Sequence, residues 1–166
     1  MDITINKKMT TKLLSAIQKD NIDHAKALIE NGADVNVKNA EGLTPLMLAE
    51  LNDQIEIAKL LIENGADVNA KDTLGLTPLM YAETYRQTEI AKLLIEKGAD
   101  VNAKDIDGLT PLMYAEKSWQ TEIAKLLIEK GADVNAKDTL GLTPLMLAES
   151  HNQTEIAKLL IEKGAK

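Results

Sequence analysis

The sequence predicts an all-α repeat solenoid, in which helix-turn-helix units stack in one row and are joined by β-hairpin-like turns. The first observation is a fixed period of 33 residues, at which the same glycine and the same proline recur. They are Gly32, Gly65, Gly98, Gly131 and Gly164, and Pro45, Pro78, Pro111 and Pro144. The second observation is near-identity, because residues 72–104 and 105–137 differ at only five of 33 aligned positions. Such a period is typical of repeat arrays, in which each unit buries its apolar face on its neighbours.

The period divides the chain into the parts of one predicted solenoid domain, residues 1–166. Residues 1–38 hold an N-terminal tail and a degenerate capping repeat, residues 39–71, 72–104 and 105–137 are internal repeats, and residues 138–166 are the C-terminal repeat. A heptad coiled coil does not explain the pattern, since 33 is not a multiple of seven and every unit contains proline and glycine.

Each complete unit begins with a short predicted helix. Thr77 supplies an N-cap hydroxyl, and Pro78 follows in the first helical turn, where its missing N–H costs nothing. Leu79, Met80 and Ala82 then line one side of this helix. The same order of residue types predicts the same helix start in the other units.

A second helix is predicted from about Thr88 onward. Its apolar stripe consists of Ile90, Leu93, Leu94 and Ile95. Glu89 in its first turn is expected to form an i,i+3 ion pair with Lys92 on the solvated side. Gly98 supplies the left-handed residue that ends the helix. Residues 99–108 are polar and turn-like, which completes a helix-helix-turn unit.

Composition and charge exclude several functions. The formal net charge of −7 opposes binding to a polyanionic nucleic-acid backbone. Without cysteine, the chain has no disulfide, thiolate metal ligand or cysteine nucleophile. Aliphatic runs such as residues 57–62 are broken by lysine, and residues 1–19 carry no apolar segment of the signal-peptide type. We therefore expect a cytoplasmic protein that binds neither membranes nor nucleic acids, with secretion by a non-classical route left open.

No pattern of catalytic or metal-binding residues emerges. The two histidines, His24 and His151, lie near opposite ends of the array, whereas a catalytic site needs unlike groups that converge in one pocket. Residues 105–108 weakly match a calcium-binding loop, but the positions that should supply further acidic ligands hold Ala103 and Tyr114. We therefore predict that the protein is not an enzyme and has no catalytic residue, metal site or cofactor.

The units differ from one another mainly in two places, the tip of the hairpin-like turn and the end of the first helix. The tips are residues 40–41, 73–74, 106–107 and 139–140, and the helix ends are residues 51–53, 84–86, 117–119 and 150–152. Stacking explains positions that are the same in every unit, whereas positions that vary are predicted to be exposed and available to a partner. The single Trp and the single Arg of the chain, both typical of binding interfaces, lie at these places.

The recurring residues resemble the ankyrin repeat. The matching positions in one unit are Asp72, Gly75, Thr77-Pro78-Leu79, Ala82, Glu89-Ile90, Leu93-Leu94 and Gly98-Ala99-Asp100-Val101-Asn102. The resemblance is strong over residues 39–166 and degenerate over residues 10–38. It implies L-shaped units stacked into a curved solenoid, with a concave face formed by hairpin tips and first helices. In this family, the tips and first-helix ends usually make the contacts with partners.

The chain departs from the family pattern at three positions of the first helix. The usual histidine after Thr-Pro-Leu is methionine, as at Met80, which replaces a polar tie with apolar packing. The second alanine is glutamate, as at Glu83, which we expect to make this helix more polar. The glycine that commonly ends the helix is Asp53, Arg86, Trp119 or Asn152. Because arginine and tryptophan tolerate a positive φ poorly, we expect a different inter-helix turn in the middle repeats.

We predict that a protein partner binds along the concave side. The expected anchors are Tyr85, Arg86 and Trp119, together with a row of leucines after the turn glycines. The row is Leu43, Leu76, Leu109 and Leu142, joined at the tips by Leu74, Ile106 and Leu140. Ionisable residues at the rim, expected to match a basic or mixed partner surface, are Glu41, Asp107, Lys117 and His151. Two explanations without a partner stay open. The leucines could be buried between hairpins, and Tyr81 and Tyr114 could simply fill space between layers.

The last repeat keeps the internal apolar pattern, where a terminal repeat usually becomes polar. The residues concerned are Ile156, Leu159, Leu160 and Ile161. A partly exposed end, pairing with another copy and further repeats beyond this one are the explanations left open, so self-association through this C-terminal repeat stays an alternative function. A second alternative is an engineered or consensus-like scaffold without a natural partner, which the near-identity of the units favours.

Overall fold

The computed structural model describes residues 3–166, with side chains from residue 8 onward. Within these residues the chain forms five consecutive pairs of helices and no β-strand. The pairs are α1 (Ile3–Gln18) and α2 (Ile22–Glu30), α3 (Pro45–Leu51) and α4 (Ile55–Glu63), α5 (Pro78–Thr84) and α6 (Thr88–Glu96), α7 (Pro111–Lys117) and α8 (Thr121–Glu129), and α9 (Pro144–Ser150) and α10 (Thr154–Glu162). The predicted all-α repeat solenoid is confirmed.

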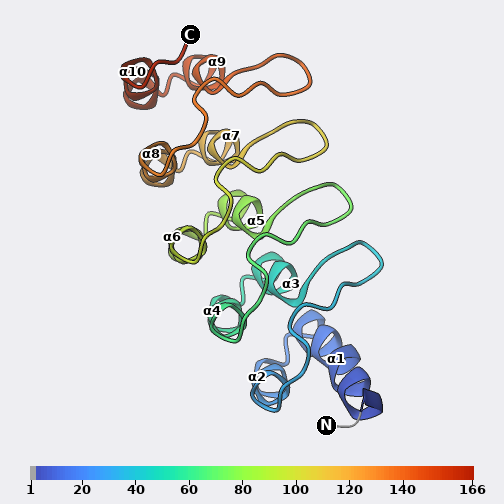
Figure 1. Cartoon of the computed structure of the whole chain (residues 1–166). Helices are drawn as coiled ribbons and strands as arrows, with labels where there is room; N and C mark the ends of the chain where they lie inside the picture. The colour runs from blue at the N-terminus through green and yellow to red at the C-terminus, as the bar shows by residue number, and fades with distance from the viewer. Residues whose placement is uncertain (1–2) are drawn as a thin grey trace.

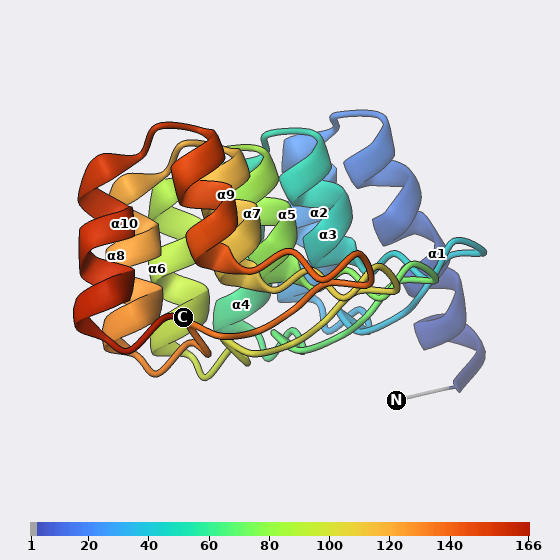
Figure 2. The ribbon, with the colours of Figure 1, turned by 90° about the horizontal axis from the view of Figure 1, so that it is seen from above.

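The helix pairs stack in one row, and we call each pair a layer. Figure 1 shows the first helices (α1, α3, α5, α7 and α9) in one row, with the second helices in a parallel row to their left. The hairpin-like turns project from the side of the first helices. Figure 2 shows that these hairpins leave one end of the helices, whereas the inter-helix turns lie at the other end. Each layer is therefore L-shaped, and equivalent residues of successive layers form rows along the solenoid.

Backbone hydrogen bonds make each long connection resemble a β-hairpin. In the second hairpin, the Asp72 N–H donates to the Leu76 carbonyl oxygen at 3.1 Å, and the Gly75 N–H donates to the Asp72 carbonyl oxygen at 3.1 Å. Neighbouring hairpins are also linked, because the Ile106 N–H donates to the Leu74 carbonyl oxygen at 3.0 Å. The row of hairpins therefore forms a continuous edge.

The first helices begin where the threonine–proline pairs predict. The Thr77 hydroxyl accepts a hydrogen bond from the Met80 N–H, and Pro78 occupies the first turn of α5. Three equivalent threonines cap their helices in the same way: Thr44, Thr110 and Thr143. The cap satisfies a backbone donor that the helix itself leaves without a partner. The predicted start of the second helix at Thr88 is also confirmed.

The turn between the two helices is the same in every layer, so the expectation of a different turn in the middle repeats is wrong. Asp53, Arg86, Trp119 and Asn152 all have a left-handed backbone, with φ between 55° and 59°. Tertiary contacts override the local preference of arginine and tryptophan. In particular, the residue after each of them is a glutamine, and its side-chain amide donates to a carbonyl oxygen of the preceding layer. These hydrogen bonds hold the turn in one place.

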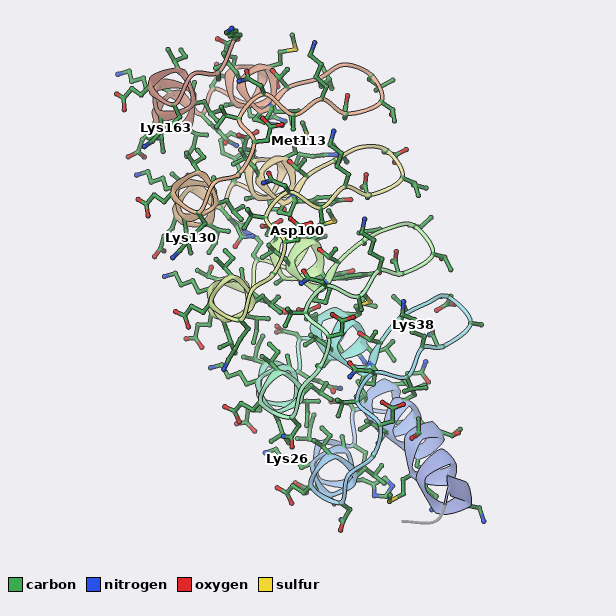
Figure 3. The ribbon with its side chains drawn as sticks, viewed as in Figure 1. Lys26, Lys38, Asp100, Met113, Lys130 and Lys163 are labelled. Carbon is green, nitrogen blue, oxygen red and sulfur yellow. The ribbon has the colours of Figure 1, made fainter. Side chains whose placement is uncertain are left out.

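The core lies between layers and contains aliphatic side chains with methionine. Leu79, Met80, Ile90 and Leu94 of one layer are each 0% exposed. The methionine that departs from the family pattern is thus a packing residue, and in Figure 3 the labelled Met113 marks its place on α7. Full burial of such a side chain stabilises the fold by about 1.5–3 kcal/mol.

Lysines on the second helices connect layers instead of pairing within their own helix. Lys26 of α2 extends toward α4 and binds Glu56 with 2.8 Å between Nζ and Oε2 (Figure 3). Lys59 binds Glu89 in the same way at 2.7 Å. The two following pairs are Lys92 with Glu122 and Lys125 with Glu155. The expectation of i,i+3 ion pairs is therefore wrong, because each of these lysines binds a glutamate of the next layer instead of one in its own helix. Exposed pairs of this kind contribute little to stability, because water and salt screen the charges.

The glutamate of the first helix is buried in the internal layers, contrary to the expected more polar helix surface. Glu50, Glu83 and Glu116 are each 0% exposed, and none of their carboxyl oxygens has a hydrogen-bond partner. Burial raises the pKa of Glu50 and Glu83 well above its usual range, and it raises the pKa of Glu116 to about 9. Burial therefore favours the protonated form of these groups, because an isolated charge is costly to bury. Glu149 of the last layer is exposed.

Candidate functional site

The hairpin tips present apolar side chains to solvent. Leu74 is 51% exposed, Ile106 is 62% exposed and Leu140 is 84% exposed. The Asp72 carboxylate holds the second tip in shape, because its Oδ1 accepts the N–H groups of Leu74 (2.8 Å) and Leu76 (2.9 Å). Asp105 and Asp138 do the same in the next two hairpins. The predicted rim residues Glu41 and Asp107 are exposed on the tips as well.

Two tyrosines fix the hairpins to the first helices. The Tyr81 hydroxyl donates to Asp72 Oδ2 at 2.7 Å, and the Tyr114 hydroxyl donates to Asp105 Oδ2 at 2.7 Å. Both side chains are half-buried, and the Tyr81 ring stacks on the Tyr85 ring with centroids 6.4 Å apart. Tyr81 and Tyr114 therefore do more than fill space between layers, since each orders the loop that carries an exposed tip.

We expect Tyr81→Phe to lower the free energy of unfolding by about 1.5 kcal/mol, because the substitution removes a hydrogen bond to a charged group and keeps the ring. Urea unfolding followed by circular dichroism measures the change. Tyr85→Phe is the control, since the Tyr85 hydroxyl forms no hydrogen bond within residues 3–166. Equal stability of Tyr81→Phe and the parent chain would show that the hydroxyl does not order the hairpin.

The leucine row is largely buried, so the expected exposed apolar stripe is wrong for most of its length. Leu43 is only 8% exposed, and Leu76 and Leu109 are half-buried. Leu43 belongs to the hydrophobic core, and Leu109 packs against a cluster formed by Met113, Ala136 and Leu147. Leu142 in the last hairpin is 38% exposed. The leucines before the last hairpin thus contribute to packing in the array.

The inter-helix turns expose the aromatic and basic residues that the sequence singles out. Tyr85 is 45% exposed and Trp119 is 56% exposed, while Arg86 and Lys117 are also exposed. The Trp119 ring contacts the half-buried His151 ring of the last layer, with centroids 5.8 Å apart. The turns therefore form a ridge on which side chains of neighbouring layers touch.

An open hollow of about 510 Å³ lies beside Tyr85 and Arg86 on this ridge. Asp53 of the preceding turn and Glu89 of α6 also line it. The hollow is thus lined by two carboxylate residues and one arginine. A positively or a negatively charged side chain of a partner would meet an opposite charge here. The hollow therefore suits a charged or polar partner surface better than a purely apolar one.

The structure does not bring all predicted residues into one cluster. The tips and the inter-helix turns lie at different ends of the first helices, as Figure 2 shows. They form two parallel rows, one of aliphatic tips and one of aromatic and charged turns. Comparison of the repeat units with one another also missed the exposure of Met146, which is 49% exposed on α9. Its counterparts in internal layers are buried, so the unit pattern alone gives no sign of its exposure.

Within the described residues, no group of three or more histidine, aspartate or glutamate side chains is arranged to hold a metal ion. No helix in residues 3–166 is long and apolar enough to cross a membrane. The buried carboxyl groups of Glu50, Glu83 and Glu116 are enclosed by the layers and do not line the hollow beside Arg86.

The fold and its exposed rows define a helical repeat protein with an extended, regular surface. The family model described as ankyrin repeats, three copies, matches residues 13–105 and 103–166. The chain belongs to the ankyrin repeat family. A comparison with curated proteins finds no match. Ankyrin repeats are in general protein-interaction modules and are typically not catalytic.

Proposed function

We propose that the chain binds a protein partner, without catalysis, through a surface made of the hairpin tips and the inter-helix turns. We call it the recognition surface. At the tips it comprises Glu41, Leu74, Ile106, Asp107 and Leu140, and at the turns it comprises Tyr85, Arg86, Lys117, Trp119 and His151. The leucines Leu43, Leu76 and Leu109 are left out, because they are buried or half-buried.

The observation that carries this proposal is the left-handed backbone of two exposed residues. Arg86 has φ 58° and Trp119 has φ 59°, a conformation that glycine or asparagine adopts with less strain. Neither side chain is buried, so packing in the core does not explain them. Strained residues that the fold does not need are typical of functional positions. Both are also among the residue types that contribute most to binding energy.

The rigidity of the array supports the same proposal. The tips and turns are held by hydrogen bonds within and between layers, as described above, so little conformational entropy is lost when a partner binds. The charges of the hollow and the net charge of −7 favour a partner surface that is basic or mixed in charge. The aliphatic hairpin tips would contact one margin of such a partner surface, and the aromatic rings at the inter-helix turns would contact the other margin.

The double variant Arg86→Asn/Trp119→Asn tests the proposal, because it separates binding from folding. We expect it to be more stable than the parent chain by about 1 kcal/mol for each position, since asparagine tolerates the left-handed backbone. We expect it to recover much less of the partner from a lysate of the source cells. Thermal unfolding and affinity capture with quantitative mass spectrometry measure the two effects.

The matched control is Glu63→Gln/Glu96→Gln, which changes two exposed residues at the ends of α4 and α6, away from the recognition surface. This control should capture the same proteins as the parent chain. If the parent, the control and the Asn variant all recover the same proteins in equal amounts, the recognition surface is wrong.

A further inference from the structure

The last layer exposes an apolar face that the internal layers bury. Leu142, Met146 and Ile161 are 38%, 49% and 56% exposed, and we call them the C-terminal face. The internal counterparts of Met146 and Ile161 are buried, and those of Leu142 are buried or half-buried. The counterparts of Met146 are Met47, Met80 and Met113, each 0% exposed, and those of Ile161 are Ile62, Ile95 and Ile128, at 6–8%. The C-terminal face is thus a fourth copy of a surface that three times in this molecule forms an interface.

Polar groups around this face also lack the partners that their counterparts have. The Glu116 carbonyl oxygen accepts a hydrogen bond from the Gln153 side-chain amide of the following layer. The Glu149 carbonyl oxygen accepts no such glutamine amide within residues 3–166. The Lys125 ammonium group binds Glu155, whereas no ion pair forms at Lys158 in the described chain. The face therefore combines an apolar centre with donors and acceptors at its edge, as protein interfaces do.

Where its side chains are described, from residue 8 onward, the first layer offers no matching apolar face at the other end of the solenoid. The outer side of the first layer exposes polar side chains, among them Lys12, Lys19, Asp23 and His24. Head-to-tail association would therefore bury apolar groups against charges. Another C-terminal face offers apolar groups of equal extent. Glu149 and Lys158 also place both signs at the rim, so two copies need not repel each other there.

We propose that the C-terminal face binds the same face of a second copy of this chain, tail to tail about a two-fold axis. Such an interface is isologous, so association stops at the dimer. The first layer, the hairpin tips and the ridge of turns stay accessible in both copies. The proposal is independent of the proposed function, since it uses none of the residues of the recognition surface.

Sedimentation equilibrium of the full chain, from about 1 µM to about 1 mM, tests the proposal. We expect the mass to rise from 18.1 kDa to twice that value and no further. Met146→Glu/Ile161→Glu should weaken the dimer by about 30-fold or more, because it places charges in the apolar centre. Both side chains are exposed in the single chain, so the variant should keep the circular dichroism spectrum of the parent.

The control Leu74→Glu/Ile106→Glu changes two equally exposed apolar residues on the hairpin tips and should dimerise like the parent. Three results would overturn the proposal. They are a parent chain that stays monomeric throughout, growth beyond the dimer as in head-to-tail association, and loss of the dimer in the control variant alone.

Discussion

A chain in which Glu116 is replaced by glutamine should resist urea better than the parent chain at pH 8, and we expect the advantage to disappear near pH 5. Burial raises the pKa of the Glu116 carboxyl to about 9, whereas the unfolded chain has the ordinary value of 4.5. Between these values the native state keeps a proton that the unfolded state releases. The free energy of unfolding of the parent therefore falls as pH rises, by about 1.4 kcal/mol per pH unit for this one group.

The stabilising contribution of this group is complete below about pH 4.5 and is lost as pH rises toward about 9. Glutamine does not titrate, so the variant lacks this slope. Its buried amide has a desolvation cost, but that cost is the same at every pH. Between pH 5 and pH 8 the variant should therefore gain about 4 kcal/mol relative to the parent. Urea midpoints at half-unit intervals of pH measure the difference.

Glu149→Gln is the matched control, because Glu149 occupies the same position of the unit and is exposed. It should leave the slope unchanged. The triple variant of Glu50, Glu83 and Glu116 should flatten the profile further, since burial raises the pKa of the other two groups as well. Identical slopes for Glu116→Gln and the parent would mean that this side chain leaves the interface when it ionises.

Gly42→Ala should destabilise the chain far more than Gly141→Ala, although the two glycines occupy the same position of the repeated turn. Both have a positive φ, 78° at Gly42 and 82° at Gly141, so alanine costs about 1 kcal/mol at either position. At Gly42, however, the new Cβ would lie 2.9 Å from the Thr73 backbone nitrogen of the next hairpin. At Gly141 no atom lies within 4 Å of that Cβ.

We therefore expect a loss of about 3 kcal/mol or more for Gly42→Ala, because the backbones of two hairpins must separate. Denaturant unfolding of the two variants beside the parent chain measures the difference. Equal losses in the two variants would show that only the backbone conformation matters and that the hairpins can move apart at little cost.

The fold could be predicted from the sequence because local signals repeat in register. Thr77 and Pro78 mark a helix start through backbone chemistry that involves few neighbours, and the same signal recurs in each complete unit. Gly98 is a comparable local signal for the end of the second helix, and it has φ 89° in the structure. Such features need no knowledge of how layers pack.

Features that depend on the neighbouring layer could not be predicted in this way. The local preferences of Arg86 and Trp119 argue against a left-handed turn, yet glutamine amides of the same turns bind the preceding layer and hold it. Glu83 has the hydration preference of a surface residue, but its position on α5 faces the following layer. Leu43 could equally lie in an exposed stripe or between hairpins, because the tilt of the hairpins decides its burial.

The position of the buried glutamates also gives the solenoid a direction. Each of these side chains is covered by the layer that follows it in the chain, as the exposure of Glu149 demonstrates. If the array frays from its C-terminal end, every detached layer returns one carboxyl group to water, beginning with Glu116. Fraying from the opposite end hydrates none at first, because the equivalent position in α1 is Ile17. Alkaline conditions should therefore make the molecule unravel from one end, layer by layer.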